Sequence, residues 1–141
     1  MAAARSSFEP SNYPSTIAAE DENRGVTVET EISPAGVASM LADGAQLVDV
    51  RQAYEWDAGH IDVAAHIPLE ELPARASELD SERPIVFQCR SGSRSSFATS
   101  AFRKAGFDAY NLAGGLLAWV ETGKPLDHAD GVVADPLLDG R

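Results

Sequence analysis

Apolar residues along the middle of the chain recur with two different periods, and the two periods alternate. Residues 26–33, VTVETEIS, alternate apolar and polar positions, which is typical of an edge or half-buried strand. Residues 33–44 follow with helical spacing, and Ser33 and Pro34 suit the N-cap and the first helical position. Gly44 is a good terminator. The pattern therefore predicts a strand followed by a short helix.

Two compact apolar runs farther along predict buried strands. They are AQLVDV at residues 45–50 and RPIVFQC at residues 83–89. The second is the stronger prediction, because large apolar residues in succession are expected where both faces of a sheet are covered. Residues 68–80, PLEELPARASELD, lie between the runs with apolar positions at helical spacing, interrupted by Pro73. We predict a helix there.

The last third of the body repeats the alternation. Residues 95–105 carry a stripe of phenylalanine and alanine at helical spacing, with Arg103 and Lys104 in the last turn, where the helix dipole favours cations. DAYNLAG at 108–114 reads as a strand and GLLAWVETG at 115–123 as a helix. Strands that alternate with helices predict an α/β fold, with a mostly parallel central sheet and helices on both faces.

These elements occupy only the middle of the 141-residue chain. Residues 1–23 are rich in Ala, Ser, Pro and Glu without a clear period, and we predict a flexible N-terminal arm. Residues 24–127 have a common single-domain size. Residues 128–141 leave little room for an element and are predicted to be a C-terminal tail, either docked on the surface or loose.

Composition excludes several classes of function. Eleven basic residues against 22 acidic ones give a net charge of −11, which disfavours nucleic acid and anionic lipid as partners. No apolar run approaches the ~20 residues that span a bilayer, and the first residues resemble neither a secretory signal nor a transit peptide. We therefore expect a cytoplasmic protein. A single cysteine and three histidines, none at ligand spacing from Cys89, predict no disulfide and no metal.

One local basic cluster surrounds the only cysteine, in CRSGSRS at residues 89–95. Ligands of parallel α/β sheets bind where a strand turns toward a helix, and the N–H groups there form an anion site. Gly92 can take the positive φ that a tight cradle requires. The helix dipole, Arg90 and Arg94 favour the thiolate of Cys89, which makes it a candidate nucleophile for an anionic substrate. The predicted substrate-binding residues are Arg90, Ser91, Gly92, Ser93, Arg94 and Ser95.

An ordinary structural interpretation stands beside this one. Free cysteine is among the most buried residue types, so Cys89 could simply end a core strand. A core cysteine, however, does not require a Gly-Ser-Arg loop directly after it. The catalytic interpretation is therefore favoured.

Residues 26–126 resemble the rhodanese family of sulfurtransferases, of the single-domain type. The order and spacing of the matching pieces make the resemblance specific. The sequence departs from the family pattern at Val63, where glycine is usual, and at His66, where asparagine is often found. These departures concern a local turn, not the loop at Cys89. The matching pieces are LVDVRQAYEWDAGHI, IPLEEL, VFQCRSGSRSS and LAGGLLAWVETGKPL.

The resemblance implies a covalent mechanism in two steps. The Cys89 thiolate would attack the outer sulfur of a donor such as thiosulfate, sulfite would leave, and a thiol or cyanide-type acceptor would remove the sulfur from the persulfide. The acceptor could be a protein. The N–H groups of residues 90–95 would hold the anion. No metal or organic cofactor is implied.

Three alternatives remain open. The first is phosphatase or arsenate reductase activity. Phosphatases that resemble this fold use Cys-x5-Arg and commonly have a histidine before the cysteine, whereas this chain has Cys-x4-Arg and Gln88. The chain could instead be a sulfur carrier or interaction module for a partner protein. A third hypothesis is redox sensing through oxidation of Cys89.

Several residues near family motifs have two possible roles. Asp49 and Arg51 point to one side of a strand, so they can orient each other, and Asp49 could accept hydrogen bonds from the loop; the alternative is an ordinary salt bridge. Glu55, Trp56 and His60 are interpreted as structural, with His60 bonded to the backbone. A His60 that activates Cys89 is the open alternative. Residues assigned to packing or tight turns are Trp119, Gly114 and Gly115.

Overall fold

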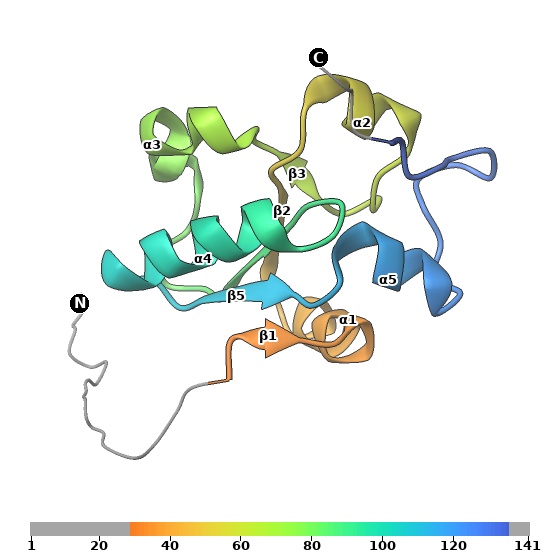
Figure 1. Cartoon of the computed structure of the whole chain (residues 1–141). Coiled ribbons are helices and arrows are strands. Elements are labelled where there is room, and N and C mark those ends of the chain that lie inside the picture. The colour runs from red at the N-terminus through yellow and green to blue at the C-terminus, as the bar shows by residue number, and fades with distance from the viewer. Residues whose placement is uncertain (1–28, 136–141) are drawn as a thin grey trace.

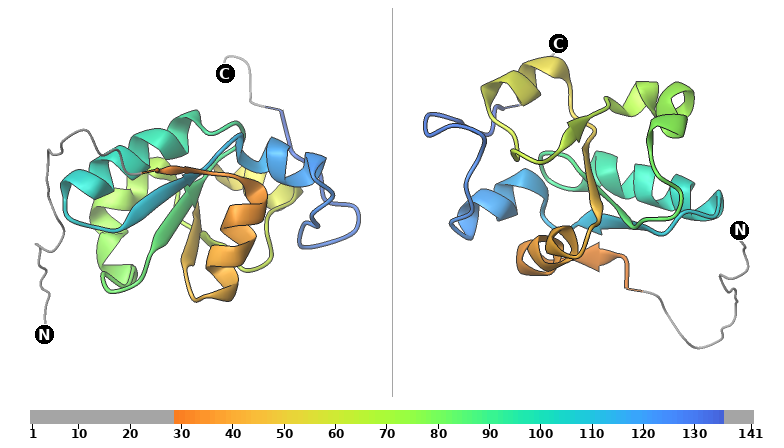
Figure 2. Two further views of the ribbon diagram at one scale, coloured as in Figure 1. Left: turned by 90° about the horizontal axis from the view of Figure 1, so that it is seen from below. Right: turned by 180° about the vertical axis from the view of Figure 1, so that it is seen from behind.

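A computed structural model describes residues 29–135 and shows a five-stranded parallel sheet with helices on both faces (Figures 1 and 2). The strand order is β1-β5-β4-β2-β3, and each neighbouring pair is parallel. The α/β prediction is confirmed, and the described sheet is parallel throughout. The elements in chain order are β1 (Glu31–Ile32), α1 (Pro34–Ala42), β2 (Gln46–Asp49), α2 (Ala53–Ala58), β3 (Ala65–His66), α3 (Leu72–Arg75), β4 (Ile85–Gln88), α4 (Ser93–Lys104), β5 (Ala109–Leu112) and α5 (Gly115–Glu121).

The central strand β4 sends successive side chains to opposite faces, and each face carries its own apolar cluster. Phe87 packs edge-to-face on Phe102 of α4, with 4.8 Å between ring centroids. Val86 lies on the other face, in a cluster with Leu116 and Trp119 of α5. All four β4 residues are buried, as the continuous apolar run predicts.

The ends of the helices follow the sequence signals closely. The hydroxyl of Ser33 accepts a hydrogen bond from the Gly36 N–H at 3.1 Å, and Pro34 opens α1. Gly44 follows the helix with φ of 104°. Helix α4 begins at Ser93, two residues before the predicted start, so the loop at Cys89 is shorter than expected.

Residues 68–80 do not form the single helix that their spacing predicts. A 3-10 turn at Leu69–Glu71 precedes the four-residue α3, and a second 3-10 turn at Ala76–Glu78 follows it. Pro73 explains the break, because it has no N–H to donate and its ring excludes a helical carbonyl one turn earlier.

The sequence interpretation missed α2 and β3, which have six and two residues. A periodic pattern needs a longer window than either provides. The first predicted strand is confirmed only at its end, as the two-residue β1. Residues 26–28 lie outside the described residues.

Residues 124–135, which follow α5, are docked on the rest of the domain. The Asp127 N–H donates to the His60 carbonyl at 2.7 Å, and the Val132 N–H donates to the Ala58 carbonyl at 2.9 Å. Hydrogen bonds from the His60 N–H and the His128 ring lower the pKa of Asp127 to about 2. The predicted tail therefore packs along the end of α2 as far as Val132, and Ala134 and Asp135 contact Arg90.

Two predictions concern parts of the chain outside the described residues. The flexible arm at 1–23 and the end of the tail at 136–141 both fall there, so the domain boundaries stay predictions. Among residues 29–135, no helix has the length and apolar character to cross a membrane.

Candidate active site

Cys89 lies at the carboxyl edge of the sheet, directly after the central strand β4 and before α4. Its side chain is 0% exposed. Three donors converge on its sulfur: the Gly92 N–H at 3.1 Å, the Ser95 N–H at 3.4 Å and the Ser95 hydroxyl at 3.3 Å. Donors that converge in this way stabilise negative charge on the sulfur.

Gly92 gives the cradle its curvature. It has φ of 110°, a conformation that residues with a side chain rarely adopt. Its carbonyl accepts hydrogen bonds from the Ser96 N–H at 2.9 Å and the Asn111 side-chain amide at 3.1 Å. Hydrogen bonds thus fix both the N–H of Gly92, which faces the Cys89 sulfur, and its carbonyl.

The carbonyls of Cys89 and Arg90 are directed toward the start of α5. Leu116 N–H donates to the Cys89 carbonyl at 2.8 Å, and Leu117 N–H donates to the Arg90 carbonyl at 3.1 Å. Gly115 permits this close approach. A Cβ atom on it would lie 2.7 Å from the Cys89 carbonyl oxygen and closer still to that of Arg90.

Arg94 is held by a carboxylate that the sequence interpretation did not place in the site. Its guanidinium donates to both oxygens of Glu55, at 2.8 and 2.9 Å. Burial alone would raise the pKa of Glu55, but the hydrogen bonds from Arg94 and from the Gln52 N–H outweigh it and lower the pKa. Both paired donors of Arg94 are thus directed to Glu55, and its predicted role in substrate binding stays a prediction. The partners are 39 positions apart in the sequence, and no local pattern could reveal the pair.

Arg90 faces the C-terminal segment. Its Nε donates to the Ala134 carbonyl at 3.1 Å, and its terminal nitrogen lies 3.0 Å from the Asp135 carboxylate. Three serines were predicted to donate hydrogen bonds through their hydroxyl groups. The Ser95 hydroxyl contacts the Cys89 sulfur, whereas Ser91 and Ser93 are exposed.

Asp49 and Arg51 form a fully buried pair beside the active edge. Arg51 donates to both Asp49 oxygens through its side chain, at 2.7 to 3.0 Å, and also to the Gly59 carbonyl at 2.9 Å. Of the two interpretations of Asp49, the structure therefore shows the salt bridge with Arg51. The bond to Gly59 fixes the start of the loop after α2, and the His66 ring of β3 contacts the Arg51 carbonyl at 2.8 Å.

Trp56 and His60 have the structural roles expected of them. Their rings stack with centroids 3.4 Å apart, and the His60 Nδ1 lies 2.9 Å from the Trp56 carbonyl. The second ring nitrogen of His60 lies 3.7 Å from Asp127. The ring is thus engaged away from Cys89. Within residues 29–135, no group of three or more His, Cys, Asp or Glu side chains is arranged to hold a metal ion.

Comparisons with known proteins agree on one family. A profile of the rhodanese-like domain matches residues 33–122. A sulfurtransferase of Allochromatium vinosum is 36% identical over 104 residues, which cover 72% of this chain and 97% of that protein. The thiosulfate sulfurtransferase GlpE of Pseudomonas aeruginosa is 34% identical over 89 residues, covering 62% of this chain and 81% of that protein.

Solved structures of rhodanese-like domains are also similar to this chain. The rhodanese-like domain of an Anabaena protein has a TM-score of 0.63 at 29% identity, covering 78% of this chain and 90% of that one. Other relatives are longer proteins. The chain spans 60% of the Bacillus subtilis protein YqhL and 25% of the probable adenylyltransferase/sulfurtransferase MoeZ of Mycobacterium tuberculosis.

Gly115→Ala is expected to destabilise the protein by about 3 kcal/mol, because the new Cβ clashes with two loop carbonyls at a φ that disfavours side chains. Gly123→Ala is the matched control. Gly123 also has positive φ but has open space around it, so about 1 kcal/mol is expected. Urea denaturation measures both. Equal losses would show that the contact with α5 does not constrain the loop.

Glu55→Gln is expected to lower the free energy of unfolding by about 1–2 kcal/mol at pH 7, because partly exposed Arg94 loses its charged partner. The folded-state pKa of Glu55 is lowered, so its contribution is complete above the ordinary glutamate value of about 4.3 and is lost as the pH falls further. The difference between the two proteins should therefore shrink between about pH 5 and pH 3.

Chemical denaturation across this pH range measures the effect. Glu78→Gln is the control, since Glu78 forms an exposed pair with Arg75 and its loss should change stability little. A difference between wild type and Glu55→Gln that stays constant with pH would contradict the assignment.

Proposed function

Because this chain belongs to the rhodanese-like family, we propose that it is a sulfurtransferase that carries sulfane sulfur on Cys89 as a persulfide. The observation that carries the proposal is the convergence of three donors, from Gly92 and Ser95, on the Cys89 sulfur. Such a cradle suits a sulfur that is negatively charged both before and after it takes up a second sulfur.

The proposed reaction has two balanced steps. The Cys89 thiolate attacks the outer sulfur of thiosulfate, the S–S bond of the donor breaks, and sulfite leaves with the electron pair. Cys89 then carries a terminal sulfur with one negative charge. A nucleophilic acceptor such as cyanide or a thiolate attacks that sulfur and releases the Cys89 thiolate. No net oxidant, metal or cofactor is required.

The protein contributes positioning and electrostatics. The N–H groups of the loop and the first turn of α4 would hold the terminal sulfur, as they hold the thiol. Arg90, at the rim, would attract the sulfonate end of the donor, because its side chain is partly exposed and its carboxylate partner Asp135 is 91% exposed. An incoming anion can replace that partner at little cost.

The engagement of Arg94 argues against a phosphatase. A phosphate clamp requires an arginine whose paired donors face the substrate. Here both donors are directed to Glu55, whose side chain is 1% exposed. Together with the short Cys-x4-Arg loop, this favours a site for sulfur over one for a tetrahedral phosphate.

A sulfur-carrier role is the second candidate, because a putative sulfur carrier protein of Bacillus subtilis, YrkF, is 39% identical to this chain over 79 residues. Since Cys89 is 0% exposed, a protein acceptor would have to reach it with a protruding thiol. The acceptor and the cytoplasmic location both stay predictions.

Incubation with thiosulfate is expected to add one sulfur atom to the wild-type protein, because the Cys89 thiolate displaces sulfite. Mass spectrometry of the intact protein measures the adduct, and cyanide should then remove it as thiocyanate. Cys89→Ser should show neither change. A wild type without an adduct from any sulfane donor, together with turnover of an aryl phosphate, would overturn the proposal.

The enzyme and the carrier differ in which acceptors work. For an enzyme with small-molecule acceptors, the preformed Cys89 persulfide should discharge rapidly to cyanide or a small thiol, in many turnovers. Stopped-flow sulfite release and thiocyanate formation measure these steps. Rapid loading followed by discharge only to a protein thiol would identify the carrier.

A further inference from the structure

The first turn of α4 supplies donors to the Cys89 sulfur and has no side-chain cap. Its N-cap residue is Gly92, which has no side chain that could accept the N–H groups of the turn. A capping side chain commonly accepts the third N–H of a helix. In α4 that group belongs to Ser95, and it lies 3.4 Å from the Cys89 sulfur. The glycine therefore leaves this donor to the sulfur, but it does not fix the start of the helix.

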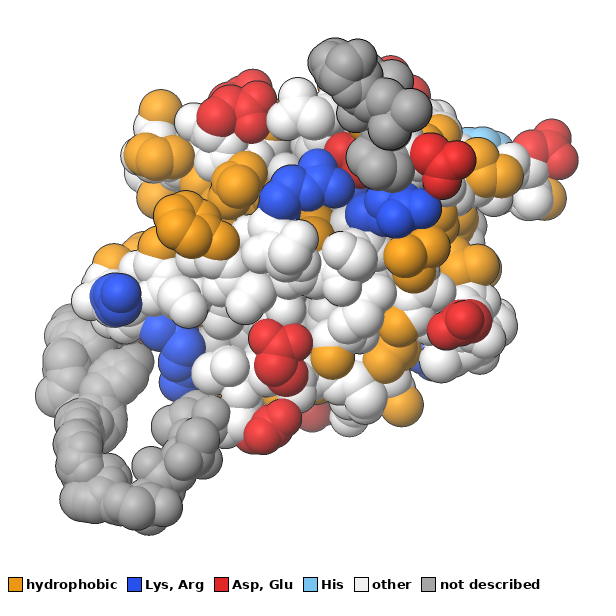
Figure 3. Space-filling model, viewed as in Figure 1, with side chains coloured by type: hydrophobic (Ala, Val, Ile, Leu, Met, Phe, Trp, Pro, Cys, Tyr) orange, Lys and Arg blue, Asp and Glu red, His pale blue; other side chains and the backbone are white. Residues whose placement is uncertain are grey.

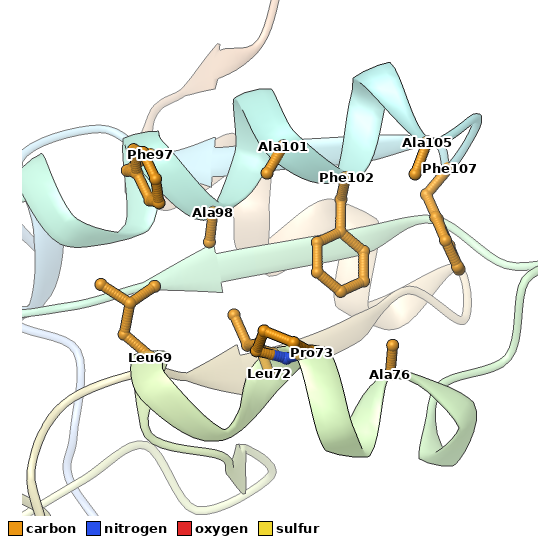
Figure 4. A pocket seen from close by; sticks show the side chains of 10 residues that line it. All are labelled: Leu69, Leu72, Pro73, Ala76, Phe97, Ala98, Ala101, Phe102, Ala105 and Phe107. Atoms are coloured by element: carbon orange, nitrogen blue, oxygen red, sulfur yellow. The ribbon is translucent and has the colours of Figure 1, made fainter.

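Apolar packing contributes little to the position of this first turn. Residues 93–96 are Ser-Arg-Ser-Ser, so the turn has no apolar side chain. Phe97, which follows, is 69% exposed and borders a pocket of about 290 Å³ between α4 and residues 69–76 (Figure 4). Large apolar side chains are buried only farther along the helix, at Phe102. Polar contacts must therefore hold the first turn in place.

Asn111 on β5 provides one of these polar contacts. Its side chain is 2% exposed, and its Nδ2 donates to the Gly92 carbonyl at 3.1 Å. The same carbonyl accepts the Ser96 N–H of the first turn at 2.9 Å. Asn111 thus joins the start of α4 to the sheet, while Arg94 joins it to Glu55 of α2.

Glu31 fixes the orientation of the Asn111 amide. The two residues are partners in the register of β1 and β5, and Nδ2 donates to both Glu31 carboxylate oxygens at 3.0 Å. Glu31 is exposed at the edge of the sheet, and Figure 3 shows acidic side chains over β1. A rotated amide would turn its oxygen toward the Glu31 carboxylate and the Gly92 carbonyl, whose oxygens can only accept hydrogen bonds. The NH₂ group of Asn111 must therefore face them.

We propose that Asn111 is a positioning residue for Cys89. Its amide, oriented by Glu31, holds the start of α4 where the donors of Gly92 and Ser95 meet the sulfur. Asn111 acts through the Gly92 carbonyl and does not itself contact the sulfur. Its effect on sulfur transfer rests on the proposed function, whereas its effect on the charge of the thiol can be measured without it.

A ¹³C label at the β carbon of cysteine tests the proposal, since Cys89 is the only cysteine and its single signal reports the ratio of thiolate to thiol. Asn111→Leu is expected to lower this ratio about fivefold near neutral pH, the effect of one lost hydrogen bond. Leucine also removes a buried atom, Asn111 Oδ1, that has no hydrogen-bond partner within residues 29–135, so the variant should fold. Sulfite release from thiosulfate should slow by a similar factor.

Thr99→Val is the matched control. The Thr99 hydroxyl donates to the Tyr110 carbonyl at 3.0 Å and to the Ser95 carbonyl at 2.8 Å, so this variant also loses a bond between α4 and β5. It leaves Asn111 bound to the Gly92 carbonyl, and the ratio of thiolate to thiol should stay that of the wild type. An unchanged ratio in Asn111→Leu, or an equal loss in both variants, would refute the positioning role.

Glu31→Ala changes only an exposed side chain and tests whether Glu31 acts through Asn111. In the wild-type background it should lower the ratio of thiolate to thiol about twofold, because the Asn111 amide loses the acceptor that orients it. In the Asn111→Leu background the same change should cause no further loss. Equal losses in both backgrounds would show that Glu31 acts independently, and the proposal would be wrong.

The two measurements separate the positioning role from the proposed function. A wild type that forms no persulfide, together with a lowered ratio in Asn111→Leu, would contradict the sulfurtransferase and support the positioning role. A wild type that forms the persulfide, together with an unchanged ratio in Asn111→Leu, would contradict the positioning role alone.

Discussion

In the loop at Cys89, two N–H groups face the sulfur and two carbonyls are bound to α5, and the rest of the active edge depends on this orientation. The Gly92 N–H faces the sulfur, whereas the Cys89 and Arg90 carbonyls accept from Leu116 and Leu117. A carbonyl turned toward the sulfur would repel negative charge there. The hydrogen bonds from α5 hold these two carbonyls in place without a bound anion, so the cradle is formed before any ligand binds.

The two arginines of the loop have carboxylate partners of opposite character. Glu55 is almost fully buried and holds Arg94 through two hydrogen bonds, so this pair is a fixed part of the structure. Asp135 is almost fully exposed, so its pair with Arg90 is screened by solvent and is weak. Arg90 is therefore held more loosely than Arg94.

Much of the fold and the position of the candidate site could be predicted from the sequence, and the features that could not be predicted have identifiable causes. The Ser33 cap, the apolar run before Cys89 and the glycine after it are local signals, and they predicted α1, β4 and the position of the cradle. The pairing of Glu55 with Arg94 and the docking of residues 124–135 join segments far apart in sequence, for which no local pattern exists. Pro73 was visible but was given too little weight against the helical spacing around it.

The hydrogen bonds of α5 and the C-terminal segment form a circuit that returns to its starting point. The Leu116 N–H of α5 donates to the Cys89 carbonyl, and the Trp119 indole of the same helix donates to the Pro125 carbonyl. The C-terminal segment then returns to the loop, where the Arg90 side chain, next to Cys89, donates to the Ala134 carbonyl. Because each contact constrains the next, residues 89–92 and 115–135 should open to solvent together as one cooperative unit, slower in hydrogen exchange than an ordinary surface loop. The lifetime of the cradle is then set by the least stable contact around the circuit, which can lie far from the sulfur.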